Sequence, residues 1–219
     1  MRVVEIFDSI DGEGIRAGEL ATFIRLAGCN LRCTYCDTPY ALKWCDGQEM
    51  PLDAVLRTVK EIGNKNITLT GGEPLLTAHG VELAVALAKE GYLVNIETNG
   101  SIDIRPVQIE RTVITMDYKT PSSGVEDAML LDNLHRLRGQ DVLKFVAGES
   151  DLPRLKELLT EHYPVQSPYI YFSPVFGKIE PERLVEFLKE LRSAGINTRK
   201  MRVQLQLHKY IWNPNKKGV

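Results

Sequence analysis

The stretch "ATFIRLAGCNLRCTYC", residues 21–36, joins a strand-like segment to three closely spaced cysteines. Residues 21–28 are rich in branched and aromatic side chains and end in glycine, which is typical of a buried strand. Cys29, Cys33 and Cys36 follow at once, so they lie in the loop that leaves this strand. A tetrahedral zinc site or an electron-carrying cluster normally takes four protein ligands. Three thiolates can instead hold three corners of a [4Fe–4S] cube, which leaves one iron open to a small molecule.

Strand-like and helix-like segments alternate along the rest of the chain. Short segments rich in β-branched and aromatic residues recur at 66–72, 92–100, 112–119, 141–148 and 169–175. Apolar residues at helical spacing lie at 52–62, 81–88, 152–159 and 184–191. Repeated strand–helix units favour parallel strands with right-handed crossovers. The sequence therefore predicts an α/β fold, an open, partial (β/α)6-type TIM barrel with parallel strands, whose catalytic edge lies at the carboxyl ends of the strands.

Length and charge narrow the function classes. The 219 residues suit a single domain that spans residues 1–219. The net charge of −2 excludes a broad basic surface, so we expect no nucleic-acid partner. The first residues lack a secretory leader pattern, and no stretch approaches the roughly 18 apolar residues of a membrane span. We therefore expect a cytoplasmic protein without a membrane partner, in which the cysteines are metal ligands rather than disulfide partners.

The sequence gives less support to two alternatives, a zinc site and a cluster with Cys45 as its fourth ligand. A zinc site would need a second pair of ligands, but the four histidines are scattered singly, at positions 79, 135, 162 and 208. Cys45 could serve as a fourth cluster ligand only if its loop folded back. A free or half-buried thiol beside Trp44 is the favoured interpretation of Cys45.

A second motif accompanies the cysteines. The sequence TGGEP at 70–74 ends the next predicted strand, and Tyr35 precedes the last cysteine. Together the two motifs resemble the radical S-adenosylmethionine (SAM) enzymes, so the predicted barrel resembles the radical SAM core. The resemblance implies a [4Fe–4S] cluster whose open iron chelates SAM, and a 5′-deoxyadenosyl radical formed by reduction of the sulfonium. Gly71 and Gly72 would let the backbone approach the cofactor, and Glu73 would accept a hydrogen bond from an ammonium group.

Within this superfamily the chain resembles the 7-carboxy-7-deazaguanine synthase family from end to end. The most specific stretches are DGEG at 11–14, Arg25, and CDT at 36–38. The resemblance implies conversion of 6-carboxy-5,6,7,8-tetrahydropterin to 7-carboxy-7-deazaguanine by ring contraction with loss of ammonia, on the route to queuosine. Members commonly have glutamine where this chain has Asp11. A carboxylate keeps the acceptor of the amide and loses its donor, so a donated contact to the pterin is not expected here.

The resemblance also assigns substrate and magnesium contacts. The substrate-binding residues would be Ile10, Asp11, Gly12, Arg25, Thr70 and the terminal Val219. The guanidinium of Arg25 matches a carboxylate in a bidentate manner. Thr38 would be the protein ligand of Mg²⁺, and because one hydroxyl binds this ion weakly, the substrate carboxylate would complete its shell. The alternatives are a turn or cap role for Thr38 before Pro39, and a solvated tail that ends in Val219.

The cofactor contacts implied by the resemblance lie at four strand ends. They are Tyr35, Cys36 and Asp37; Gly72 and Glu73; Asp117, Tyr118 and Lys119; and Ser173, Pro174, Val175 and Phe176. Residues 97–100 end the third predicted strand and should line the same cleft. Asp117 and Lys119 could equally form a rim salt bridge worth about 0 to 1 kcal/mol.

The expected partners are the carboxypterin substrate, a reductant such as flavodoxin or ferredoxin, and a second copy of the chain in a homodimer. Two rival functions share parts of the pattern. A glycyl-radical-enzyme activase would share the cysteine loop but would have no need of Arg25 and Thr38. A non-catalytic iron–sulfur electron carrier would need Cys45 as a fourth ligand, so replacing Cys45 separates it from the enzyme.

Overall fold

The computed structural model describes residues 1–214 and 216–219. Nine strands of this part form one sheet in the order β3-β1-β2-β4-β5-β6-β7-β8-β9. Their bounds are β1 Arg2–Ile10, β2 Leu20–Leu26, β3 Gln48–Glu49, β4 Asn66–Gly71, β5 Leu93–Thr98, β6 Thr112–Tyr118, β7 Val142–Ala147, β8 Tyr169–Pro174 and β9 Met201–Val203. Every pairing from β2 through β4 to β9 is parallel, whereas β1 pairs antiparallel with both β2 and β3.

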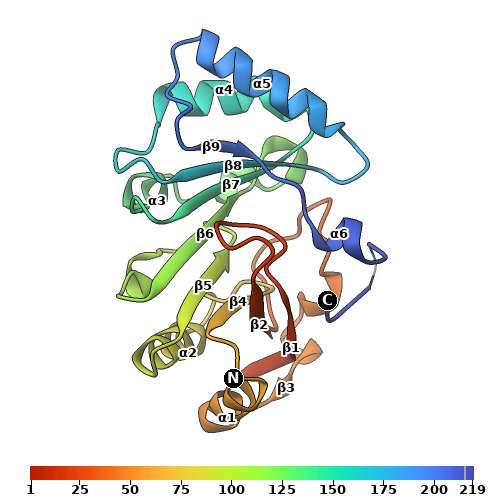
Figure 1. Cartoon of the computed structure of the whole chain (residues 1–219), viewed down its shortest axis with the longest axis vertical. Coiled ribbons are helices and arrows are strands. Elements are labelled where there is room, and N and C mark those ends of the chain that lie inside the picture. Colours follow the sequence, from red (N-terminus) through yellow and green to blue (C-terminus); the bar gives the residue numbers. More distant parts are fainter. Residues whose placement is uncertain (215) are drawn as a thin grey trace.

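The helices are α1 Leu52–Ile62, α2 Ala78–Lys89, α3 Asp132–Arg136, α4 Leu152–Glu161, α5 Pro181–Ser193 and α6 His208–Ile211. In Figure 1, α1 and α2 lie beside one half of the sheet and α4 and α5 beside the other half. Helix α1 starts after Pro51 and ends where Gly63 adopts a φ of 90°, a conformation that glycine tolerates best. Its buried residues, Val55 and Val59, are one helical turn apart and face the core.

The predicted open, partial barrel is confirmed, with one correction. The six predicted strands are β2 and β4 to β8, and the four predicted helices are α1, α2, α4 and α5. The sheet is not wholly parallel, because the antiparallel β1 and β3 extend its edge beside β2. Strand β1 is only partly buried, and its charged residues interrupt the apolar pattern that identifies the central strands.

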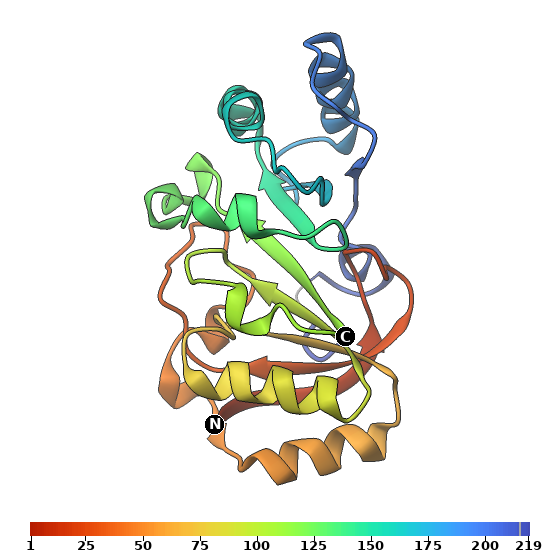
Figure 2. The same cartoon turned by 90° about the vertical axis from the view of Figure 1, so that its left-hand side faces the viewer.

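The loop between β1 and β2, residues 11–19, crosses the interior of the open barrel. At one end, Arg16 donates hydrogen bonds to the carbonyl oxygens of Ile67 and Leu93, at the amino ends of β4 and β5. At the other, the backbone of Gly12 and Gly14 bonds the segment that leads into α6. Figure 2 shows this red loop beside the blue C-terminal segment. The loop therefore links the amino ends of β4 and β5 to the segment that follows β9, across the interior of the barrel.

The apolar core lies between the sheet and the surrounding helices. It combines the outward-facing side chains of the central strands, such as Leu69 and Ile96, with helical residues such as Leu83 and Phe187. No helix in the described part of the chain has the length and apolar character needed to cross a membrane.

Candidate active site

A cavity of about 360 Å³ opens at the carboxyl ends of the parallel strands. Its lining comes from the loops that follow β2, β4, β5, β6 and β8, from the β1–β2 loop and from the C-terminal tail. In parallel α/β sheets this edge is where ligands bind, since loops from several strands converge there. The volume is of the size that holds small-molecule ligands.

The three cysteines of the β2 loop line this cavity together. Cys29, Cys33 and Cys36 are free and half-buried, whereas Cys45 is exposed and is not part of the lining. Burial raises the pKa of the Cys29 and Cys33 thiols, and a coordinated metal would deprotonate them. The sulfur of Cys29 already faces two N–H donors, the backbone of Leu31 at 3.4 Å and the amide of Asn99 at 3.8 Å.

The donor set fits a cluster better than a single ion. Among residues 1–214 and 216–219, no three His, Cys, Asp or Glu side chains converge on a point that could hold one metal ion. Each thiolate on a cube binds a different iron, so three half-buried sulfurs around one cavity suit a [4Fe–4S] cluster. The structure therefore favours the cluster over zinc for these cysteines.

The TGGEP loop packs directly on the cysteine loop. The backbone N–H groups of Gly72 and Glu73 donate to the carbonyl oxygens of Leu26 and Gly28, at 2.9 and 2.8 Å. A Cβ on Gly72 would collide with the Gly28 and Ala41 carbonyl groups. The glycine is therefore required by this close approach of two backbones next to the first cysteine. Gly72 also lines the cavity, as predicted.

The side chain of Glu73 does not serve the cavity. It is 2% exposed and accepts hydrogen bonds from the Leu75 and Asn99 backbone and from the Thr98 hydroxyl, at 2.7 to 2.9 Å. The expected role as an acceptor for a ligand ammonium group therefore does not fit, because the carboxylate is buried among protein donors and is not part of the cavity lining. Glu73 instead ties the ends of β4 and β5 together.

The other predicted cofactor residues divide into two groups. Tyr35, Cys36, Asp37, Asp117, Lys119, Val175 and Phe176 line the cavity, and Tyr118, Ser173 and Pro174 do not. The Tyr118 side chain is buried beneath the site and donates to Glu126, and the Ser173 hydroxyl donates to Glu13 at 3.0 Å. In a strand, alternate residues face opposite sides of the sheet, so Tyr118 and Pro174 face away from the cavity. Ser173 faces the interior, but its hydroxyl is used by Glu13.

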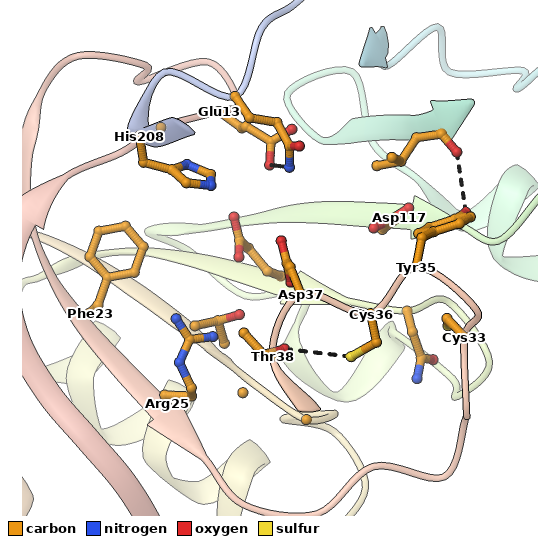
Figure 3. Close-up of a pocket in the computed structure, with 18 of the residues that line it drawn as sticks. Glu13, Phe23, Arg25, Cys33, Tyr35, Cys36, Asp37, Thr38, Asp117 and His208 are labelled. Atoms are coloured by element: carbon orange, nitrogen blue, oxygen red, sulfur yellow. Dashed lines mark hydrogen bonds between the residues drawn. The ribbon is translucent and has the colours of Figure 1, made fainter. Parts of the chain in front are cut away.

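Tyr35 has a fixed orientation over the cysteine loop. Its hydroxyl donates to the carbonyl oxygen of Val146 at 3.2 Å and lies 3.3 Å from the Thr120 hydroxyl. Burial raises the pKa of Tyr35 to about 12, so the phenol stays neutral. The ring is thus held as a rigid wall of the cavity next to Cys36, as Figure 3 shows.

Asp117 and Lys119 form the ion pair that the sequence left as an alternative. Their charged groups are 2.8 Å apart, and both residues line the cavity rather than an exposed rim. Burial alone would lower the pKa of Lys119. The attraction of the adjacent Asp117 carboxylate is stronger than this effect and raises the pKa of the lysine. One oxygen of Asp117, Oδ1, is buried without a hydrogen-bond partner in the described residues. It remains able to accept a hydrogen bond from a ligand.

Most predicted substrate residues share the same cavity. Ile10, Gly12, Arg25, Thr70 and Val219 all contribute to its lining. Figure 3 shows Thr38 between Arg25 and Cys36 in this view. The structure therefore brings the cysteine loop and the predicted carboxylate anchor into one space.

Asp11 is the exception among the predicted substrate residues. Its side chain does not line the cavity and is 2% exposed. The carboxylate accepts a hydrogen bond from the Thr68 hydroxyl at 2.5 Å and lies 3.2 Å from Nε of Arg16. The side chain is committed to the protein, which agrees with the expected loss of a donated substrate contact.

Thr38 occupies the predicted cap position but does not act as a cap. It precedes the short 3-10 turn Pro39–Ala41, and its hydroxyl makes no capping hydrogen bond. The hydroxyl lies 3.9 Å from the Cys36 sulfur, and the residue lines the cavity. The oxygen is therefore available to a ligand or an ion.

A buried charged group in the cavity was not anticipated from the sequence. Lys144 of β7 lies 3.2 Å from Glu13 and 3.7 Å from Asp117. Burial alone would raise the pKa of Glu13, but Lys144 and a hydrogen bond from Gln206 lower it to about 2. His208 lines the same region. Two features of the sequence could have indicated this pair. Lys144 interrupts an otherwise apolar strand, and Glu13 lies between two glycines.

The C-terminal tail lies over the cavity. Gly218 and Val219 line it, and Nζ of Lys217 lies 4.0 Å from the ring centroid of Tyr40. A cation at this distance from an aromatic face is attracted to it. This placement favours a role at the site over a solvated tail.

Comparison with known proteins agrees with this geometry. The chain matches the Radical SAM superfamily over residues 23–203. A 7-carboxy-7-deazaguanine synthase from Clostridium acetobutylicum is 44% identical over 100% of this chain and 99% of its own length. One from Leptospira interrogans is 37% identical over 99% and 97% of the two chains.

This chain belongs to the 7-carboxy-7-deazaguanine synthase family of radical SAM enzymes. The superfamily inferred from the cysteine and TGGEP motifs, and the family inferred from DGEG at 11–14, Arg25 and CDT at 36–38, are thereby confirmed. Membership in the radical SAM superfamily implies a [4Fe–4S] cluster and SAM. The crystal structure of QueE from Escherichia coli has the same fold, with a TM-score of 0.69, 23% identity, and coverage of 93% of this chain and 92% of QueE.

Proposed function

We propose that this protein converts 6-carboxy-5,6,7,8-tetrahydropterin to 7-carboxy-7-deazaguanine with loss of ammonia. The observation that carries the proposal is the single cavity that joins the cysteine loop to Arg25 and Thr38. Full-length similarity to synthases that bear this name supports the same reaction. A glycyl-radical-enzyme activase acts on a polypeptide loop and has no use for a buried carboxylate anchor.

Cys29, Cys33 and Cys36 would hold the cluster at the carboxyl end of β2. When bound there, the cluster and SAM supply reductive cleavage of the sulfonium and a radical that abstracts a substrate hydrogen. The chain has to hold both molecules in fixed positions and exclude water and other hydrogen donors. The packed glycine loop at Gly72 and the rigid ring of Tyr35 supply this fixed wall.

SAM is best assigned to the side of the cavity nearest the cysteines. Tyr35, Asp37 and Gly72 lie there, and the Asp117–Lys119 pair follows from β6. The free oxygen of Asp117 can accept a hydrogen bond from a polar group of the cofactor. Val175 and Phe176 add apolar surface at the end of β8.

The pterin is best assigned to the side bounded by the β1–β2 loop. Gly12 and Ile10 border this side, and Arg25 offers a cationic fork to the substrate carboxylate. Thr38 would ligate Mg²⁺ next to the same carboxylate, so metal and substrate should bind cooperatively. Val219, at the end of the tail, would cover the bound pterin.

Three further features belong to the proposal. A small electron carrier such as flavodoxin or ferredoxin would deliver the electron for each turnover. The chain would act as a homodimer, and it would work in the cytoplasm, where thiols stay reduced.

The proposed function is tested with anaerobically reconstituted protein, SAM, a reductant, Mg²⁺ and 6-carboxy-5,6,7,8-tetrahydropterin. The expected result is 7-carboxy-7-deazaguanine, identified by mass, whose formation depends on SAM and on the reductant. A control without the pterin should form 5′-deoxyadenosine only slowly. If the carboxypterin neither accelerates 5′-deoxyadenosine formation nor is consumed, the proposed substrate is wrong.

A further inference from the structure

A β-bulge near the start of β1 turns Glu5 toward the interior of the barrel. Val3 pairs with Leu26, and both side chains belong to the apolar core. The register then shifts, so that Glu5 pairs with Arg25. Successive residues of a strand face opposite sides of a sheet, so Arg25 faces away from the core side that Leu26 occupies. In a regular ladder Val4 would lie opposite Arg25, and Glu5 would face the apolar core.

Glu5 binds the guanidinium of Arg25 from the side. Its Oε1 accepts a hydrogen bond from Nε of Arg25 at 2.7 Å and another from the hydroxyl of Tyr40 at 3.1 Å. The side chains of Glu5 and Arg25 are only 21% and 13% exposed. Such a pair is less screened by water and salt than a surface pair.

The two terminal nitrogens of Arg25 stay free. An arginine has five N–H donors in one plane, and the Nε donor is used by Glu5. Within the described part of the chain, Nη1 and Nη2 make no hydrogen bond to a protein acceptor. Arg25 and Tyr40 line the cavity, and Glu5 lies behind them. The remaining pair of donors has the geometry that binds a carboxylate in a bidentate manner.

We propose that Glu5 is a positioning residue, which holds Arg25 so that its terminal nitrogens meet the carboxylate of the substrate. The identity of that carboxylate rests on the proposed function. An arginine that is already ordered loses less side-chain freedom when the substrate binds. The Tyr40 hydroxyl keeps the Glu5 carboxylate in place. The ammonium group of Lys217, in the C-terminal tail, lies over the face of the Tyr40 ring.

Removal of Glu5 could in principle either strengthen or weaken binding of the substrate carboxylate, and this difference makes the proposal testable. If Glu5 were only a counter-ion, it would compete with the substrate carboxylate, and its removal would strengthen binding of the anion. If it is a positioning residue, its removal weakens binding. A glutamine at the same place keeps an oxygen that can accept from Arg25 and Tyr40, so it separates orientation from charge.

The test measures the binding of two oxidised, unreactive pterins to the reconstituted holoenzyme with SAM and Mg²⁺. The probes are 6-carboxypterin and pterin, which lacks the carboxyl group, and the variants are Glu5→Ala and Glu5→Gln. Glu49→Ala is the control, since Glu49 is an exposed residue on the neighbouring β3 and does not line the cavity. Glu5→Ala should weaken 6-carboxypterin binding about tenfold and leave pterin binding unchanged. Glu5→Gln should stay within about threefold of the parent for both probes.

Unchanged or tighter binding of 6-carboxypterin to Glu5→Ala would overturn the positioning role. If Glu5→Ala does not fold, Tyr40→Phe decides the matter, because it removes one of the two anchors of the Glu5 carboxylate. Tyr40→Phe should weaken 6-carboxypterin binding alone, by about threefold, and no change would overturn the proposal. A parent protein that binds the two probes equally would instead contradict the carboxypterin assignment itself.

Discussion

The carboxylate of Asp11 lies 3.2 Å from the guanidinium of Arg16, within the loop that crosses the barrel. Arg16 also donates to Asn66, Ile67 and Leu93 at the amino ends of β4 and β5. The pair therefore anchors the β1–β2 loop, which carries the proposed pterin contacts. The side chain of Asp11 does not reach the cavity. Asp11 therefore affects the site by holding the β1–β2 loop in place.

Breaking this pair from the arginine side should be costly. Arg16→Met leaves the Asp11 carboxylate buried without its cation, and we expect a loss of about 3 kcal/mol in the free energy of unfolding at neutral pH. The double variant Asp11→Asn/Arg16→Met should be less destabilised than the sum of the single variants by about 1 kcal/mol. Urea denaturation of the four proteins measures this coupling, and strict additivity would show that the pair does not interact.

The same variant should respond to pH in a defined direction. Burial raises the pKa of Asp11, so its contribution to stability favours low pH and is lost as the pH rises through the pKa in the folded state. Without Arg16 this pKa should rise further. The stability deficit of Arg16→Met should therefore be smaller at pH 5 than at pH 7.5. A deficit that is equal at both pH values would exclude titration of Asp11 as the cause.

Glu13 should stabilise the fold at neutral pH and lose this effect in acid, which is the opposite pH dependence to that of Asp11. Its pKa is lowered from 4.5 to about 2, so its stabilising effect is complete above pH 4.5 and is lost as the pH falls toward 2. Glu13→Gln should lose less stability between pH 4.5 and 2 than the parent does. Thermal denaturation across this range tests the prediction, with Glu49→Gln as a control that should follow the parent. A Glu13→Gln curve parallel to the parent's would show that Lys144 does not stabilise the carboxylate.

The metal role of Thr38 predicts a separable defect. Thr38→Ala removes one oxygen ligand and should raise the Mg²⁺ concentration needed for half-maximal turnover, while iron and sulfide content stay unchanged. Thr38→Ser keeps the hydroxyl and should behave like the parent. If all three proteins show the same Mg²⁺ dependence, Thr38 is not the ligand.

The central strands of this fold could be predicted because they are buried on both faces. The segments that became β4 and β7 are short, rich in branched or aromatic residues and buried almost throughout, and each is followed by a helix with a start or stop signal. Strand β1 escaped prediction, since Glu5 and Asp8 break its pattern and its bulge changes the side that each residue faces. A bulge depends on the pairing of two strands and is not visible in either strand alone.

The candidate site was predictable where a motif is local. Arg25, Thr38 and the three cysteines at 29, 33 and 36 lie within fourteen consecutive positions, and all of them line the cavity. The partnership of Glu13 with Lys144 spans 131 positions of the sequence and emerges only from the curvature of the sheet. The side chain of Glu73 shows the converse limit, because a residue inside a cofactor motif can be used entirely for structure.

The cysteine assignment predicts different outcomes for two cysteine replacements. Cys33→Ala removes one of three thiolates and should abolish both cluster assembly and turnover. Cys45→Ala should leave both intact, since Cys45 is exposed and outside the cavity. Iron and sulfide analysis of the reconstituted variants measures the first effect, and an active Cys33→Ala protein without iron would refute the assignment.

The central claim is that one iron of the cluster has no protein ligand and is open to SAM. Electron paramagnetic resonance of the reduced, anaerobically reconstituted protein tests it directly, with and without SAM, in the parent and in Cys45→Ala. A [4Fe–4S] signal that changes on addition of SAM, equally in both proteins, is the predicted result. A signal indifferent to SAM, or one that disappears in Cys45→Ala, would contradict the account.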